Sequence, residues 1–175
     1  MLKRLLSAGA AALAALGAAC EDGPATLAGT WRSPAAWSSM IYATSAGPML
    51  VEVHGDPFGL DAAGFRAAVA QAMTNQIIGR PTAFTADPQQ APQPRFRVAL
   101  AFDPPADADA RQLCQGPIAT AAARQERVTV LGAFCDGATL LASVRGWVAK
   151  VEGPDDRRFL QLIGQLTREL FGNPP

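Results

Sequence analysis

The residues best suited to acid–base chemistry are His54 and Asp56, which lie together in the stretch HGDPFG at 54–59. His54 is the single histidine of the chain, and loops at strand ends often carry active residues. A serine hydrolase also needs a positioned nucleophile, and the sequence has no Gly-x-Ser-x-Gly elbow. A zinc site draws three or four ligands, which one histidine cannot supply. We therefore expect Asp56 to begin a turn and His54 to lie on a polar strand face beside Glu52. A hydrolase or metalloenzyme using His54 and Asp56 is the least favoured of three functions.

Asp103, Asp107 and Asp109 raise the question of a calcium site. Their spacing is not that of the twelve-residue EF-hand loop, so we expect a solvated acidic loop. The 15 basic and 15 acidic side chains balance, and no broad positive field exists to attract nucleic acid. These observations predict a non-catalytic protein with no metal, no cofactor and no nucleic-acid partner.

The three cysteines predict an oxidising compartment. Cys114 and Cys135 are expected to pair in a disulfide, which leaves Cys20 as the odd thiol. Residues 1–19 have the layout of a secretory signal peptide, with Lys3 and Arg4 before an uncharged apolar run. This run is too short to span a bilayer comfortably, because a transmembrane helix takes about 20 residues.

The small residues Gly17, Ala18 and Ala19 stand directly before Cys20. This run resembles the lipobox of bacterial lipoproteins, with Gly17 in place of the usual leucine. The resemblance implies that diacylglycerol is attached to the Cys20 sulfur, that the leader is cut before it, and that the new amino terminus is acylated. Two or three acyl chains give stable membrane anchoring. The alternative is ordinary cleavage near Ala19, which leaves Cys20 as a free thiol.

A lipid anchor at Cys20 implies a location in the cell envelope. The mature domain would face the periplasm from the outer membrane, with the inner membrane as the alternative. We therefore expect a membrane-anchored envelope lipoprotein with a binding or scaffolding role, whose partner is another envelope protein, a polysaccharide or lipid.

Residues 20–47 are expected to hold the lipidated cysteine and a tether, because glycine, proline and small polar residues show no lasting period there. Trp31 and Trp37 are unusual for a linker and are expected to dock on the domain or on a partner. Gly29, Thr30 and Trp31 resemble the Gly-x-Trp start of lipocalins, which implies a carrier of a small apolar ligand as the second function. The rest of the chain lacks the eight regular strands of that barrel.

Residues 48–175 are expected to form a single domain. Alternating apolar residues predict strands over 49–54 and 96–102. An apolar stripe predicts a helix from Asp61, as its cap, to about Ile78. A second stripe predicts a helix that starts at 153–156 and runs to Gly172.

The pair Asp136 and Gly137 stands between two strand-like runs, 126–135 and 138–151. It predicts a hairpin with a type I′ turn that places Cys135 opposite Ala138. The order is then β-α-β-β-β-α. We expect an α+β fold with a mostly antiparallel sheet of about four strands and two helices on one face.

Overall fold

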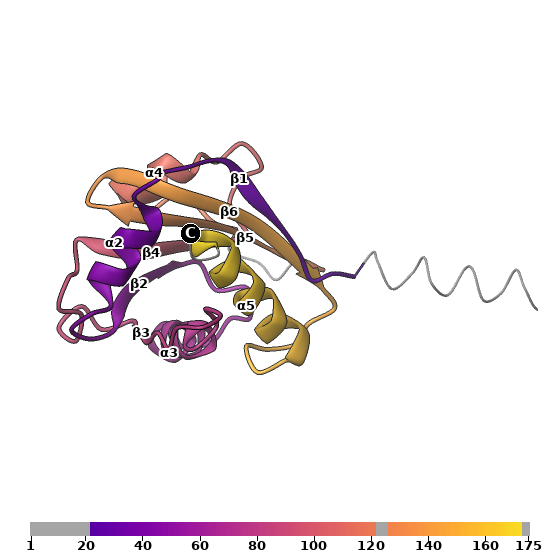
Figure 1. The fold of residues 1–175 in the computed structure, drawn as a ribbon. Coiled ribbons are helices and arrows are strands. Elements are labelled where there is room, and N and C mark those ends of the chain that lie inside the picture. The colour runs from indigo at the N-terminus through magenta and orange to yellow at the C-terminus, as the bar shows by residue number, and fades with distance from the viewer. Residues whose placement is uncertain (1–21, 122–125, 173–175) are drawn as a thin grey trace, which may run out of the picture.

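The structure is a computed structural model that describes residues 22–121 and 126–172. One mixed sheet forms its centre (Figure 1). The elements in chain order are β1 (Ala25–Arg32), α2 (Ala36–Ala43), β2 (Met49–His54), α3 (Ala62–Met73), β3 (Phe84–Thr85), β4 (Phe96–Phe102), α4 (Ala110–Gln115), β5 (Arg127–Asp136), β6 (Thr139–Ala149) and α5 (Arg157–Phe171).

The sheet has six strands in the order β1-β6-β5-β4-β2-β3. The neighbours β1 and β6, β6 and β5, and β5 and β4 run antiparallel, whereas β2 runs parallel to both β4 and β3. The helices α2, α3 and α5 pack on one face, and α4 packs on the other. The predicted α+β class is confirmed, but the expected four strands, two helices and element order are wrong in detail.

The largest correction concerns the expected tether at 20–47. Within it, β1 pairs with β6 and α2 buries Ala36, Met40 and Ala43 in the main core. No residue of β1 is buried, so neither of its faces has to be apolar and its sequence shows no alternation. Its hydrogen bonds to β6, a strand distant in the sequence, hold it in place. The strand β3 was missed because its two residues are too few to show an alternating pattern.

The hairpin between β5 and β6 differs from its prediction by one position. Asp136 pairs with Thr139, so the two turn residues are Gly137 and Ala138. Gly137 has a φ of 57°, which is the requirement of a type II′ turn at its first central residue. Cys135 therefore lies opposite Leu140 instead of Ala138.

A bulge after the turn changes which side chains share a face. Cys135 pairs with Leu140, but Phe134 pairs with Ala142, so one extra residue enters β6. Leu131 consequently lies opposite Arg145, and Phe134 turns toward the helices, where it is buried. Both faces of β5 are buried over most of its length.

The predicted Asp61 cap exists, and both predicted helices have different bounds. The Asp61 carboxylate accepts from the backbone N–H groups of Ala63 and Gly64 at 3.1 and 2.7 Å. The helix that it caps ends at Met73, before the predicted Ile78. The last helix, α5, begins later than expected, because Asp156 is its N-cap and accepts from a backbone N–H at 2.8 Å.

Aromatic rings fill the space between α3, α5 and the sheet. Phe65 and Phe102 lie 5.0 Å apart between ring centroids, and Phe159 lies 5.9 Å from Phe102. All three are at most 1% exposed.

None of the helices in the described part of the chain combines the length and the hydropathy that a membrane span requires.

Candidate functional site

The α4 face of the sheet is only half covered. Over β4 and β5, α4 buries a small second core. That core contains Ala99, Ala101, Ala108, Ala110, Leu113, Cys114, Leu131, Ala133 and Cys135. Over β1 and β6, large side chains remain in solvent, with Leu27 73% and Trp31 51% exposed. We call the surface formed there the open groove.

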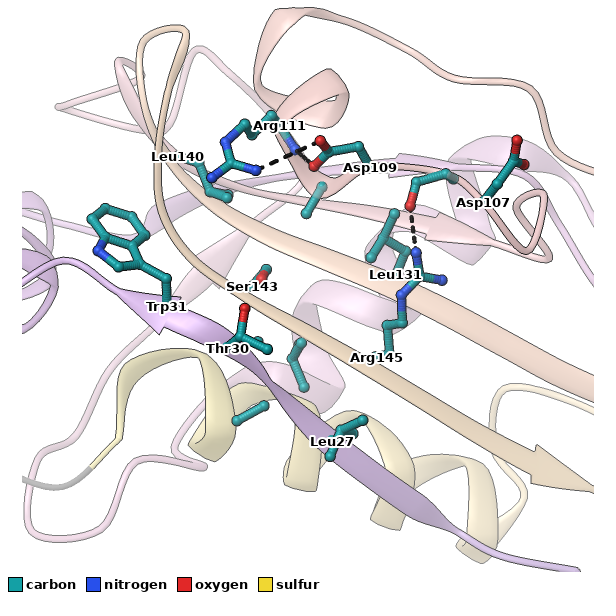
Figure 2. Close-up of a pocket in the computed structure, with 15 residues that line it drawn as sticks. Leu27, Thr30, Trp31, Asp107, Asp109, Arg111, Leu131, Leu140, Ser143 and Arg145 are labelled. Atoms are coloured by element: carbon teal, nitrogen blue, oxygen red, sulfur yellow. Dashed lines mark hydrogen bonds and ion pairs between the residues drawn. The ribbon is translucent and has the colours of Figure 1, made fainter.

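The open groove has two adjoining parts that share Leu27 and Arg145. The outer part, of about 470 Å³, lies between Trp31 and the start of α4 (Figure 2). The inner part, of about 460 Å³, is more apolar and includes Ala25, Pro104, Ala106 and Trp147. Leu27 lies opposite Arg145, and Ala25 lies opposite Trp147, so these side chains share the α4 face.

Irregular pairing at the end of β1 positions Trp31. The register shifts between Ala28 and Arg32, so the segment before Arg32 does not follow the regular ladder. A Cβ at Gly29 would lie 2.1 Å from the Ser143 hydroxyl oxygen and 3.0 Å from the Ser143 carbonyl oxygen, so a larger residue would require Ser143 or the backbone to shift. Trp31 then projects beside Leu140 and Arg111 (Figure 2).

Charged groups line the outer part of the groove on the α4 side. Asp109 caps α4 by accepting from the Arg111 N–H at 2.9 Å and also pairs with the Arg111 guanidinium at 3.6 Å. The Arg145 guanidinium donates to the carbonyl of Ala108. These contacts hold polar groups around an exposed aromatic ring, so the groove offers both a stacking surface and hydrogen-bonding groups.

His54 and Asp56 have different surroundings in the structure. The Asp56 carboxylate accepts from the backbone N–H groups of Phe58, at 2.9 Å, and Leu60, so it closes the expected turn. His54 is partly buried, and its Nε2 has no hydrogen-bond partner. Burial lowers the pKa of His54, against the opposing effect of Glu52.

The three aspartates expected in an acidic loop have separate surroundings. Asp103 is buried, and its carboxylate accepts from the Thr129 N–H at 2.8 Å and hydroxyl at 3.2 Å. Asp109 caps α4, and Asp107 is exposed. Residues 22–121 and 126–172 contain no group of three His, Cys, Asp or Glu residues that could hold a metal ion. The expectation of a solvated loop is thus wrong for Asp103, which fixes the loop to β5.

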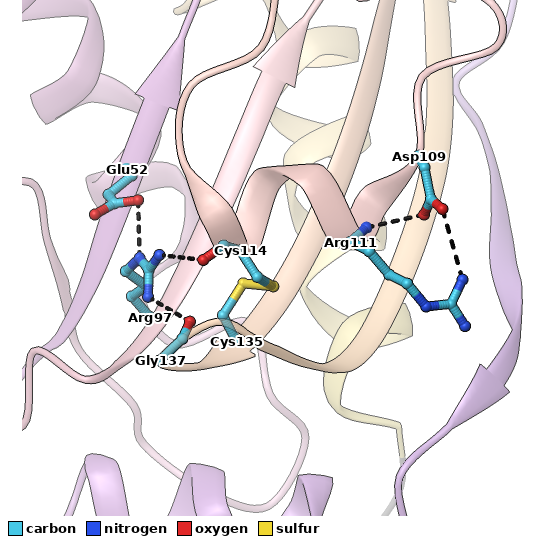
Figure 3. The surroundings of a disulfide bond; sticks show 7 residues. All are labelled: Glu52, Arg97, Asp109, Arg111, Cys114, Cys135 and Gly137. Carbon is cyan, nitrogen blue, oxygen red and sulfur yellow. Dashed lines mark hydrogen bonds and ion pairs between the residues drawn. A yellow bond between two sulfur atoms is a disulfide. The ribbon is translucent and has the colours of Figure 1, made fainter.

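The predicted disulfide between Cys114 and Cys135 is confirmed and joins α4 to β5 (Figure 3). Beside it, the Arg97 guanidinium donates to the Glu52 carboxylate, the Gly137 carbonyl and the Cys114 carbonyl, each at 2.9 Å. Arg97 therefore joins β2, the hairpin turn and α4 around one side chain. Its role was not expected, because a single arginine in a strand has no local signature.

The predicted lipidation residue, Cys20, and the signal peptide at 1–19 lie outside the described residues. Trp37 packs against the main core, as expected of a docked tryptophan, whereas Trp31 is half exposed. The resemblance of Gly29, Thr30 and Trp31 to the start of lipocalins implied a closed barrel. That fold is wrong, because the six strands form an open sheet.

Comparison with known proteins finds no matching family model and no matching curated protein. Among solved structures, a PelC dodecamer from Paraburkholderia phytofirmans is similar, with a TM-score of 0.43 and 11% sequence identity. The similarity covers 86% of this chain and 100% of that one. At this distance, function has to be argued from the residues of this chain.

Proposed function

We propose that this chain is a membrane-anchored envelope lipoprotein with a non-catalytic binding role, and that the open groove is its binding surface. The observation that carries the proposal is the exposure of Leu27 and Trp31, at 73% and 51%, on a sheet face that α4 leaves uncovered. Large apolar side chains gathered on a surface mark interaction sites.

The anchor is proposed from the cysteines and the leader. Cys114 and Cys135 are joined to each other, which leaves Cys20 without an intramolecular partner. Disulfides persist in oxidising compartments such as the periplasm, and the lipobox-like run before Cys20 supports lipidation there. We place the domain on the periplasmic side of the outer membrane, with the inner membrane as the alternative.

The composition of the outer groove favours an envelope polysaccharide over a protein partner. The Trp31 ring offers a flat apolar surface, and the side chains of Thr30, Ser143 and Arg111 offer hydrogen-bonding groups around it. Sugar rings present apolar faces edged by hydroxyl groups, so a surface of this kind can contact both. An aromatic ring in a protein interface would instead occupy a pocket on the partner.

The anchor is tested by mass spectrometry of the mature protein made in a bacterial host from the full precursor. The expected result is an acylated amino-terminal peptide that begins at Cys20, with the protein in the membrane fraction. The Cys20→Ala variant should lose both. An unmodified precursor in the wild type would overturn the proposed location.

The binding surface is tested by photo-crosslinking in intact cells, with a photoreactive phenylalanine analogue in place of Trp31, which keeps an aromatic ring at this position. Ile78, which is 72% exposed and lies outside the groove, provides the matched control position. We expect products at position 31 that polysaccharide-degrading enzymes remove. Products that only protease removes would show a protein partner, and equal products at position 78 would refute the groove as the binding surface.

A carrier of a small apolar ligand is the second candidate function, because the inner part of the groove is lined by Ala25, Leu27 and Trp147. In the described part of the chain, buried rings and aliphatic side chains fill the main core between the helices and the sheet. Displacement of an apolar dye that is lost in a Leu27→Asn variant would favour the carrier.

A further inference from the structure

The chain is already attached to the domain at Asp22. The Asp22 carbonyl accepts from the Ala149 N–H at 2.8 Å and from the Arg158 guanidinium at 2.6 Å. The Lys150 ammonium pairs with the Asp22 carboxylate at 3.1 Å. The start of β1, the end of β6 and the start of α5 therefore meet at the first described residue.

Only Glu21 separates Cys20 from Asp22. A fully extended chain covers at most about 3.6 Å per residue, so Cys20 reaches about 7 Å beyond Asp22. The headgroup layer on one side of a bilayer is about 5 to 8 Å thick, from the difference between the total and hydrocarbon thicknesses. The two lengths match, which leaves no length for a free tether.

We propose that the anchored protein sits directly on the headgroup layer, with the surface formed by residues 22–24, 126–127 and 149–158 against the lipid. We call this surface the anchored end. The inference rests on the proposed lipidation of Cys20 and adds an orientation to it. The partner of the anchored end is the lipid surface that holds the acyl chains.

Chain length, and not charge, produces this contact. The segments of the anchored end carry four cations and five acids, which are Arg127, Lys150, Arg157 and Arg158 against Asp22, Glu126, Glu152, Asp155 and Asp156. A surface with no excess of positive charge has no net attraction to anionic lipids. The orientation should therefore be the same on zwitterionic and anionic membranes.

The orientation also places the open groove. β1 leads away from the anchored end, beginning at Ala25 opposite Trp147 (Figure 1). Its eight residues span about 26 Å at about 3.3 Å per residue. The inner part of the groove thus opens beside the headgroup layer, and Trp31 lies no more than one strand length from it.

The test uses the full lipidated protein in vesicles that contain quencher lipids, with the fluorophore at position 152 or at position 78. Glu152 lies in the anchored end. Ile78 lies near the far end of α5, because its neighbour Gln76 accepts from Arg168 at 3.0 Å. We expect strong quenching at position 152, weak quenching at position 78, and no change when anionic lipid is added.

A second variant keeps the proposal falsifiable. Inserting 12 glycine and serine residues between Glu21 and Asp22 adds a mean reach of about 20 Å and should abolish the quenching at position 152. Arg158→Ala should weaken the quenching, and Arg157→Ala is the matched control that should not. Equal quenching at both positions, or no effect of the insertion, would overturn the inference in protein that mass spectrometry shows to be lipidated. Unmodified Cys20 would instead overturn the proposed function.

Discussion

The two halves of the α4 face differ in what their strands present. Over β4 and β5, the side chains under α4 are small, with Ala99, Ala101 and Ala133 all fully buried. Over β1 and β6, the side chains are large and uncovered, with Leu27 and Trp31 mostly in solvent. The covered half supports the fold, and the open half is available to a partner.

The difference shows how a short helix can define a groove. Small residues let α4 lie close to the sheet, where the disulfide and Arg97 hold it (Figure 3). The start of α4 then forms one wall of the open groove. Loss of the covered half should therefore reduce stability, whereas changes in the open half should affect binding alone.

The largest expected change in stability follows from removal of the disulfide. The variant with Cys114→Ser and Cys135→Ser should lower the free energy of unfolding by about 3 kcal/mol, because the bond closes a loop with a sequence separation of 21. Urea denaturation monitored by circular dichroism measures the change. A loss below about 1 kcal/mol would mean that α4 is held without its covalent link.

A smaller loss is expected from Arg97→Met, which removes three hydrogen bonds from a side chain that is 14% exposed. We expect a destabilisation of about 2 kcal/mol, because the Glu52 carboxylate and the carbonyls of Gly137 and Cys114 would each lose a hydrogen-bond donor. Arg95→Met is the matched control. Arg95 pairs with Asp136 but is 71% exposed, so its removal should cost less than about 0.5 kcal/mol.

The pH dependence of stability tests His54, which also lies on the α4 face. Burial lowers its folded-state pKa below the ordinary value of 6.5. The unfolded chain therefore binds the proton more readily than the folded chain. The contribution of neutral His54 to the free energy of unfolding is complete above about pH 6.5 and is lost as the pH falls from there through the lowered folded-state pKa. His54→Gln should flatten the unfolding free energy over that range. An unchanged slope would assign the dependence to other groups.

The smallest effect on stability is expected in the open half. Trp31→Ala should change the unfolding free energy by less than about 0.5 kcal/mol, because the ring is mostly in solvent, yet it should abolish partner binding. Trp37→Ala is the matched control, since Trp37 packs against the main core and its loss should destabilise the fold. Destabilisation by Trp31→Ala would remove the distinction between the halves.

Local patterns predicted several elements that lie outside the open half. Alternation located the strands at 49–54 and 96–102, a polar cap located the start of α3, and the cysteine count located the disulfide. The open half could not be predicted in this way. β1 depends on pairing with a strand more than a hundred positions away, and the exposure of Trp31 depends on where α4 ends its cover. Asp56 was correctly expected to begin a turn, because Asp-Pro is a local signal, and His54 was correctly expected on a strand.

β1 ends the sheet, and no strand in the described part of the chain pairs with its outer edge. Charged side chains and proline usually protect a strand edge against self-association. The stretch from Ala25 to Trp31 contains neither. Concentrated solutions of the soluble domain should therefore be prone to aggregation along this strand. Anchoring each molecule to a bilayer in one orientation would limit the encounters between β1 edges that start this aggregation.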